Sequence, residues 1–158
     1  KVIQGIYRPI SDQKLWCFLV DDRLPTNEQF RQANKIVKKM KLVKASTIKF
    51  KNITPQNVCA YIAEHPKTIL LDVRTAGEFQ GKADPDFGSL KNAINIPIQE
   101  LENRISELNA YKKSEILVYC SHSHRSPQAA YLLNQNGFSH VVNLSGGMSE
   151  LQNGSCKK

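Results

Sequence analysis

The amino-acid sequence predicts an α/β fold with a parallel sheet that is covered by helices on both faces. Two short apolar runs, residues 69–73 and Ile116–Tyr119, have the composition of strands buried on both sides of such a sheet. Helical patterns alternate with these runs: residues 100–108 carry apolar side chains at helical spacing, and Ser126-Pro127 opens a further apolar helix. Strands that alternate with helices in this way predict parallel strand pairing.

Elements towards the N-terminus complete this outline. Residues 15–20 have the pattern of a strand, and residues 27–40 form a predicted amphipathic helix with Phe30, Val37 and Met40 on its apolar side. Residues 47–51 then alternate as an edge strand does, and Thr54-Pro55 predicts the start of a helix. These patterns divide the chain into a basic extension over residues 1–45, a main domain over residues 46–152 and a polar tail over residues 153–158.

The net charge of +8 is unevenly distributed along the chain. Residues 1–51 contain twelve Lys and Arg against four Asp and Glu, whereas residues 52–158 contain ten of each. The helix over residues 27–40 is expected to pack its apolar side on the main domain, or else to bind an acidic protein partner or an anionic membrane surface. No nucleic-acid-binding motif is present, so no nucleic acid is expected, and no apolar run approaches the ~18–20 residues that span a membrane.

The four cysteines are widely spaced and lack the paired spacing of a zinc site. Cys17 and Cys59 lie in apolar patterns and are expected to be buried thiols. Cys156 lies in a polar segment, where it could pair or react. Cys120 has a different setting, because it directly follows a predicted strand and faces the N-terminus of a predicted helix.

Residues 120–126 have the features of a reactive loop. The N-terminus of the following helix and the free backbone N–H groups of a tight loop stabilise negative charge, which favours a thiolate at Cys120. Arg125 closes the loop with a fixed positive charge, and four residues separate it from Cys120. This arrangement predicts a cysteine nucleophile for sulfur or phosphoryl transfer.

Four motifs in the main domain resemble those of the rhodanese sulfurtransferases. They are Cys120-x-x-x-x-Arg125-Ser126, Leu-Leu-Asp-Val-Arg-Thr-Ala-Gly-Glu-Phe at residues 70–79, Ala-Ile-Asn-Ile-Pro at 93–97, and Val-Asn-Leu-Ser-Gly-Gly-Met at 142–148. The resemblance implies a mainly parallel five-stranded sheet with helices on both faces, catalytic roles for Cys120 and Arg125, and no metal or organic cofactor. The remaining site residues expected on this basis are Ser121, His122, Ser123, His124 and Ser126 for substrate binding, and Asp72 and Arg74 for structural support.

Individual side chains around the loop lead to separate expectations. Arg74 could pair with Glu78, one helical turn later. His122 and His124 are expected to point outward and attract an anionic sulfur donor rather than bind a metal. Ser123 stands where many rhodanese loops have Gly, so a positive φ at this residue would cost ~1 kcal/mol or more. Residues 80–92 are expected to form a loop.

The predicted function is that of a sulfurtransferase, which moves a sulfane sulfur from a donor such as thiosulfate to a thiol or cyanide-type acceptor through a Cys120 persulfide. Two alternatives stay open. One is a phosphatase or arsenate reductase of the related fold, whose loop has five residues between Cys and Arg; the other is a rhodanese-fold protein-binding module. A cytoplasmic monomer is expected, or a periplasmic or secreted protein if a signal peptide was removed before Lys1.

Overall fold

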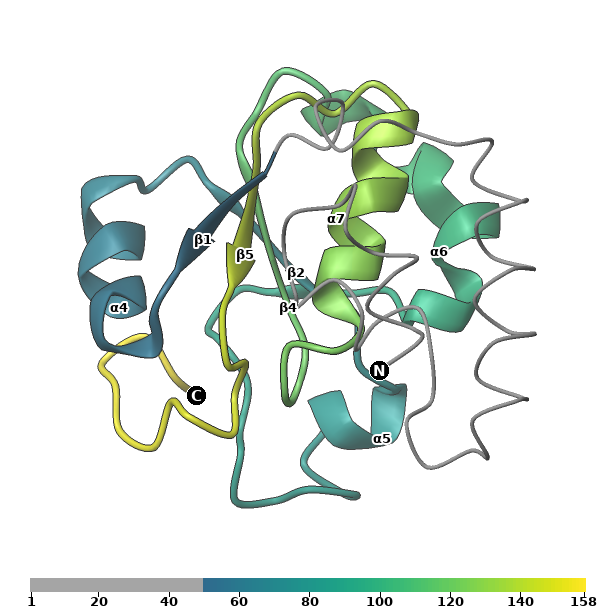
Figure 1. Ribbon diagram of the computed structural model, residues 1–158. Coiled ribbons are helices and arrows are strands. Elements are labelled where there is room, and N and C mark those ends of the chain that lie inside the picture. Colours follow the sequence, from purple (N-terminus) through teal and green to yellow (C-terminus); the bar gives the residue numbers. More distant parts are fainter. Residues whose placement is uncertain (1–49) are drawn as a thin grey trace, which may run out of the picture. The chain divides into compact units, whose positions relative to one another are not determined.

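Five parallel strands form the central sheet of the protein in a computed structural model that describes residues 50–158 (Figure 1). Their order is β1-β5-β4-β2-β3. The strands are β1 (Phe50–Ile53), β2 (Ile69–Asp72), β3 (Ile94–Asn95), β4 (Ile116–Tyr119) and β5 (Val141–Leu144). The predicted parallel five-stranded sheet is confirmed. The strand expected at 15–20, the helix at 27–40 and the whole extension 1–45 lie outside the described residues.

Helices cover both faces of this sheet (Figure 1). On one face lie α6 (Ile98–Arg104), the 3₁₀ helix η2 (Ile105–Tyr111) and α7 (Ser126–Gln135), and on the other lies α4 (Pro55–Glu64). The four-residue helix α5 (Ala76–Phe79) follows β2. The helix expected over residues 100–108 therefore continues beyond Arg104 in the tighter 3₁₀ form, which is common at helix ends.

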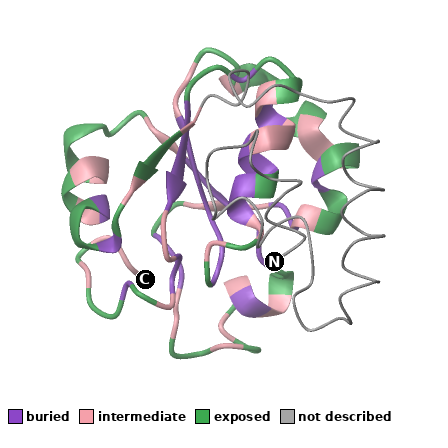
Figure 2. Cartoon of the chain, viewed as in Figure 1, coloured by how far each residue is buried: buried purple, intermediate pink, exposed green. Residues whose placement is uncertain are grey.

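Side chains alternate along β4 and so divide the core into two layers. Ile116 and Val118 pack in the layer with α6 and α7, whereas Leu117 and Tyr119 pack in the layer with α4. All four residues of β4 are buried, as Figure 2 shows for the centre of the sheet. Burial on both faces accounts for the unbroken apolar run at this position in the sequence. Cys120, the next residue, joins the layer with α7.

The register of the sheet brings the loops after β2 and β4 to the same edge. Asp72, the last residue of β2, pairs with Tyr119, the last residue of β4. The carboxyl ends of neighbouring parallel strands end together in this way, and open α/β sheets form their sites at that edge. The segments that follow Asp72 and Tyr119 are therefore placed to contact one another.

Ser126 is of a residue type that commonly caps helices, but it does not cap α7. Arg125 is the residue before the helix and makes no side-chain capping bond, while Ser126 is the first helical residue. The Ser126 hydroxyl is instead hydrogen-bonded with the Cys120 thiol, which explains why it does not cap. Gly137, two residues after the helix, has φ +88°, the left-handed conformation in which helices commonly end.

Cys59 is wrongly predicted as a free buried thiol, because it forms a disulfide with Cys156. The two residues are 97 positions apart in the sequence, and their Cα atoms are 5.2 Å apart. Only the tertiary structure brings them together, so no local pattern could have paired them. The disulfide joins α4 to the C-terminal segment, defined as residues 152–158, which runs antiparallel to Leu90 at Lys157.

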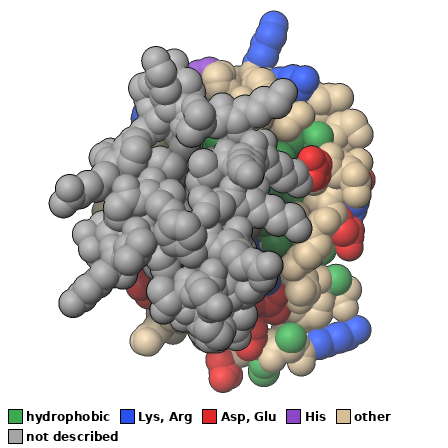
Figure 3. Space-filling view, turned by 45° about the vertical axis from the view of Figure 1, so that its right-hand side comes forward, with side chains coloured by type: hydrophobic (Ala, Val, Ile, Leu, Met, Phe, Trp, Pro, Cys, Tyr) green, Lys and Arg blue, Asp and Glu red, His purple; other side chains and the backbone are tan. Residues whose placement is uncertain are grey.

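Charged side chains of both signs are present on the surface of the described part of the chain (Figure 3). This distribution agrees with the equal numbers of acidic and basic residues between positions 52 and 158. Within residues 50–158, no helix has the length and apolar character that a membrane crossing requires.

Candidate active site

Cys120 lies between the end of β4 and the start of α7, and its side chain is buried. The backbone N–H of Ser126 donates a hydrogen bond to the Cys120 Sγ at 3.4 Å, and the Ser126 hydroxyl lies at the same distance from the sulfur. Because Ser126 begins a ten-residue helix, its N–H belongs to the group of helix-terminal amides that have no partner within the helix. The sulfur therefore faces the positive end of the α7 dipole.

Arg125 closes the loop by a two-point ion pair with Glu78 of α5. Its Nη1 and Nη2 atoms donate to the two Glu78 carboxylate oxygens at 2.8 and 2.7 Å. Ser121 joins the same group, since its hydroxyl donates to Glu78 at 2.9 Å and accepts from Arg125 at 3.2 Å. Planar pairs of this kind fix the orientation of both side chains. The loop of residues 120–125 is thus tied to α5 at its second and last residues.

Glu78 is itself held in place by Thr75. The Thr75 hydroxyl accepts from the Glu78 backbone N–H, and the Glu78 carboxylate accepts from the Thr75 backbone N–H, which together form a capping box. The hydrogen bonds from Arg125 hold the pKa of Glu78 well below its ordinary value, although partial burial opposes this effect. The same pair raises the pKa of Arg125. Both groups are therefore charged at neutral pH.

The expectation that Arg74 pairs with Glu78 is wrong, and Glu78 is the site residue that sequence reasoning missed. Arg74 pairs with Asp72 at 2.7 Å, and both side chains are fully buried. Thr75-x-x-Glu78 matches the pattern of a capping box, which could have placed the Glu78 carboxylate at the start of α5. Its second partner, Arg125, is 47 positions away and needs the tertiary structure.

The Asp72–Arg74 pair supports the loop of residues 80–92. Arg74 Nη2 donates to the carbonyl of Gly88 at 2.8 Å, and the guanidinium lies 5.6 Å from the centre of the Tyr119 ring. The Tyr119 hydroxyl accepts from the backbone N–H of Leu90 at 3.1 Å. Two fully buried side chains thus hold this loop: Arg74, which follows β2, and Tyr119, the last residue of β4.

The turn at Gly146-Gly147 packs directly against the backbone of the Cys120 loop. The N–H groups of Met148 and Ser149 donate to the carbonyls of Cys120 and Ser121, both at 2.9 Å. Gly147 has φ +67°, and a Cβ on this residue would collide with the same two carbonyl groups. Glycine is therefore required at position 147 both by the backbone conformation and by the close approach.

Ser123 has a φ of +60°, so the backbone strain considered for this loop position is present. Its hydroxyl donates to the carbonyl of Leu144 at 3.3 Å and accepts from the Asn143 side chain at 3.3 Å. Asn143 also donates to Asn52, so β5 and β1 both contribute to this network. Hydrogen bonds to neighbouring strands hold Ser123 in a conformation that glycine would adopt without strain.

His122 and His124 are exposed, as expected for alternate residues of a curled loop. The centres of the two imidazole rings are 6.5 Å apart. The rings of Phe87 and His122 pack edge to face, with their centres 5.5 Å apart. Phe87 belongs to the loop of residues 80–92, so His122 connects the two loops. Among the described residues, no group of three His, Cys, Asp or Glu is arranged to hold a metal ion.

Comparison with known proteins places this site in a family. The sequence model of the rhodanese-like domain matches residues 55–153, and the chain belongs to that family. The chain is 33% identical over 86 residues to the thiosulfate sulfurtransferase PspE of Escherichia coli, and this match covers 54% of the chain and 73% of PspE. It is 36% identical over 88 residues to the protein YqhL of Bacillus subtilis, where the match covers 56% of the chain and 64% of YqhL.

Solved structures agree with this assignment. A rhodanese-related protein from Thermoplasma volcanium superimposes with a TM-score of 0.51 at 31% identity, over 64% of this chain and 89% of that one. A rhodanese-like domain protein from Staphylococcus aureus superimposes with a TM-score of 0.55 at 25% identity, over 68% of this chain and 96% of that one. The family model begins at residue 55, after the N-terminal extension.

Replacing Asp72 by Asn should destabilise the protein strongly. The Arg74 guanidinium would remain buried without its counter-charge, and loss of one partner of a buried pair costs about 3–5 kcal/mol. Denaturant unfolding measures the change. Glu100→Gln is the control, because it removes one carboxylate from the exposed Arg104–Glu100 pair and should leave stability nearly unchanged. Equal effects of the two substitutions would contradict the supporting role of Asp72.

Gly147→Ala should destabilise the protein and displace the Cys120 loop, because the new methyl group collides with backbone atoms that cannot rotate away. Gly137→Ala provides the comparison, since this residue also has a positive φ but has open space around it. The control should cost only the backbone strain, about 1–2 kcal/mol. If Gly147→Ala and Gly137→Ala had the same melting temperature, the close approach of Gly147 to the Cys120 loop would not be needed for stability.

Glu78→Gln should make the protein less dependent on pH in the acid range. The folded state lowers the pKa of Glu78, so its contribution to stability is complete above its ordinary pKa and declines progressively as the pH falls from there towards the lowered pKa. At pH 7 the variant should lose roughly 1–3 kcal/mol with the charge-assisted hydrogen bonds. Thermal melts between about pH 3 and 7 should therefore converge for the variant and the wild type at low pH. If the melting temperatures of the variant and the wild type differed by the same amount at every pH, this role of Glu78 would be excluded.

Proposed function

We propose that the protein is a sulfurtransferase that carries sulfane sulfur on Cys120. The main support is the position of the Cys120 sulfur at the N-terminus of α7, within hydrogen-bonding distance of the Ser126 N–H and hydroxyl. The loop that holds it has four residues between Cys120 and Arg125. Relatives whose names describe this activity, the PspE protein above and a sulfurtransferase of Allochromatium vinosum at 30% identity over 96 residues, support the same choice.

The reaction consists of two displacements at sulfur. The Cys120 thiolate attacks the outer sulfur of thiosulfate, the sulfur–sulfur bond of the donor breaks, and sulfite leaves with the electron pair. The enzyme then holds a persulfide, whose outer sulfur is attacked by the thiolate of an acceptor or by cyanide. Cys120 leaves as thiolate and returns to its starting state. No net electron transfer to the protein and no organic or metal cofactor is involved in either step.

The residues around Cys120 take different parts in this scheme. The N–H and hydroxyl of Ser126 stabilise the negative charge on Cys120 or on the persulfide. Arg125 acts as a positioning residue, because Glu78 and Ser121 occupy its Nη1 and Nη2 donors and it closes the loop through them. His122 and His124 are exposed on the same loop, where protonated imidazoles would attract an anionic donor.

Donor access requires movement around the sulfur. Cys120 has no exposed surface, so a donor must displace side chains that cover it. Phe87 and His122 are placed to take part, since their ring contact joins the loop of residues 80–92 to the Cys120 loop. A change in that contact would alter access without disturbing the Glu78–Arg125 pair.

A thiosulfate incubation tests the proposal directly. Wild-type protein should gain one sulfur atom in intact-mass measurement, and Cys120→Ser should gain none, while Cys156→Ser should still gain it. Peptide mapping should place the added sulfur on Cys120. Absence of an adduct with thiosulfate and with other sulfane donors would contradict the proposal. An aryl phosphate assay on the same samples tests the phosphatase alternative, which is expected to show no activity above that of Cys120→Ser.

A further inference from the structure

A second sulfur group lies outside the Cys120 loop, at the disulfide between Cys59 and Cys156. Cys59 is on α4 and Cys156 is in the C-terminal segment, and both residues are partly exposed. The proposed transfer reaction uses only Cys120, so this disulfide has no part in it. The partial exposure of these two residues, and the place of Cys156 on a pocket, favour attack on the disulfide by a thiolate.

The disulfide holds the C-terminal segment against residues 89–91. The Cys156 carbonyl accepts from the Lys91 N–H at 2.9 Å, and the Ser89 carbonyl accepts from the Lys158 N–H at 2.8 Å. Leu90 and Lys157 form an antiparallel bridge between these contacts. The segment is therefore paired with the chain like a short extra strand, and the disulfide is its covalent attachment to the domain.

Residues 89–91 continue directly into the part of the chain that borders the Cys120 loop. Gly88 accepts from Arg74, and Phe87 contacts the ring of His122. The C-terminal segment also reaches α5, where the Lys158 ammonium lies 5.4 Å from the centre of the Phe79 ring. Phe79 follows Glu78, the partner of Arg125. The segment thus contacts two of the elements that border the Cys120 loop, the loop of residues 80–92 and α5.

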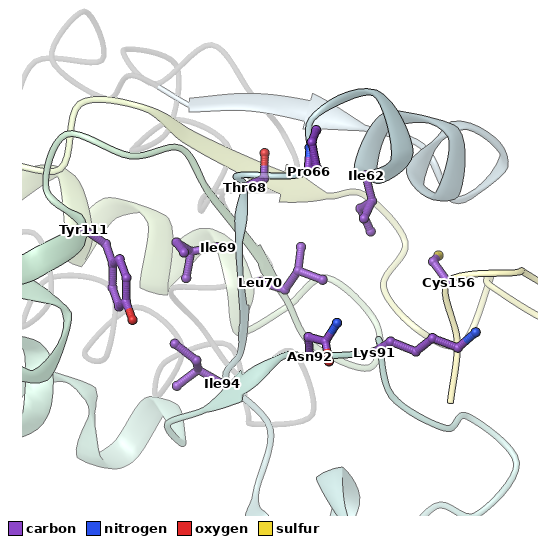
Figure 4. Close-up of a pocket in the computed structure, with 10 residues that line it drawn as sticks. All are labelled: Ile62, Pro66, Thr68, Ile69, Leu70, Lys91, Asn92, Ile94, Tyr111 and Cys156. Carbon is purple, nitrogen blue, oxygen red and sulfur yellow. The ribbon is translucent and has the colours of Figure 1, made fainter.

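A pocket of about 510 Å³ provides an approach to this disulfide (Figure 4). Cys156 and Lys91 lie at one end of it, and Ile62, Leu70 and Ile94 contribute apolar lining. The pocket also includes Ile69, the first residue of β2, so it extends to the amino end of that strand, whereas Cys120 follows the carboxyl end of β4. A small thiol can therefore reach Cys156 without entering the Cys120 site, and the Lys91 ammonium favours one that carries a carboxylate.

We propose that Cys59–Cys156 is a thiol–disulfide exchange site that controls access to Cys120. A small anionic thiol attacks Cys156, the Cys59–Cys156 bond breaks, and Cys59 leaves as thiolate. A second thiol then attacks the mixed disulfide, which releases an external disulfide and leaves both protein cysteines reduced. The two electrons come from the two thiols. Without the covalent attachment, the C-terminal segment separates from residues 89–91, and the loop that carries Phe87 opens.

Hydrogen exchange and alkylation of Cys120 test this proposal independently of persulfide formation. In Cys59→Ser and Cys156→Ser, amide exchange at Lys91 and Lys158, whose N–H groups bond across the contact, should rise by about tenfold, and so should the rate of Cys120 alkylation by iodoacetamide. This factor corresponds to the net contribution of one lost hydrogen bond. Exchange in β4 and β5 should be unchanged. Gln152→Ala, which changes an exposed side chain of the same segment and leaves the disulfide in place, serves as the control and should behave as wild type.

A second experiment compares wild-type protein with and without reduced glutathione, so its result does not depend on the folding of a variant. Glutathione should reproduce the changes at Lys91 and Lys158, and removal of the thiol with reoxidation should reverse them. Lys91→Gln should slow reduction by glutathione more than reduction by neutral 2-mercaptoethanol. Free thiols at Cys59 and Cys156 in protein purified without reductant would overturn the proposal. The proposal would also be overturned if the disulfide were present but its reduction changed neither amide exchange nor the alkylation of Cys120.

Discussion

The two-point pair between Glu78 and Arg125 is the constraint on which the geometry around Cys120 depends. It joins a helix after β2 to the last residue of the loop after β4, so the position of the sulfur is determined by two neighbouring strands. The pair is partly exposed, which keeps the cost of removing its charges from water below that of a fully buried pair. The fully buried Asp72–Arg74 pair carries that larger cost and supports the adjoining loop instead. Two separate ion pairs thus have different roles: Glu78–Arg125 orients the Cys120 loop, and Asp72–Arg74 supports the loop of residues 80–92.

Backbone groups complete this arrangement where side chains cannot. The carbonyls of Cys120 and Ser121 would point into a packed region without partners if Met148 and Ser149 did not donate to them. Because Gly147 has no side chain, the turn after β5 can approach these two carbonyls closely. The Ser123 hydroxyl holds the middle of the loop by its hydrogen bond to the carbonyl of Leu144. The Cys120 loop is therefore held by α5, by β5 and by the turn after β5 before any substrate binds, which reduces the reorganisation needed during transfer.

Sequence patterns predicted the features that depend on neighbouring residues, and missed those that depend on distant ones. The apolar run at β4 and the loop after it follow from local composition and spacing, whereas the question of backbone strain at Ser123 arose only from the family resemblance. The partner of Arg125 lies 47 residues away, and the partner of Cys59 lies 97 away, so neither has a local signature. Ser126 shows a third kind of error: its residue type suited a helix cap, but the nearby sulfur competes for its hydroxyl. The roles of the individual site residues in catalysis remain predictions.

The shortness of β3 has a consequence for association between copies of the protein. An edge strand with free N–H and C=O groups can pair with another chain, and long flat edges promote aggregation. β3 has only two residues, and Pro97 follows shortly after it, with no N–H to donate. The β3 edge of the sheet therefore offers almost no template for an added strand, and a second copy of the protein could not readily extend the sheet on that side.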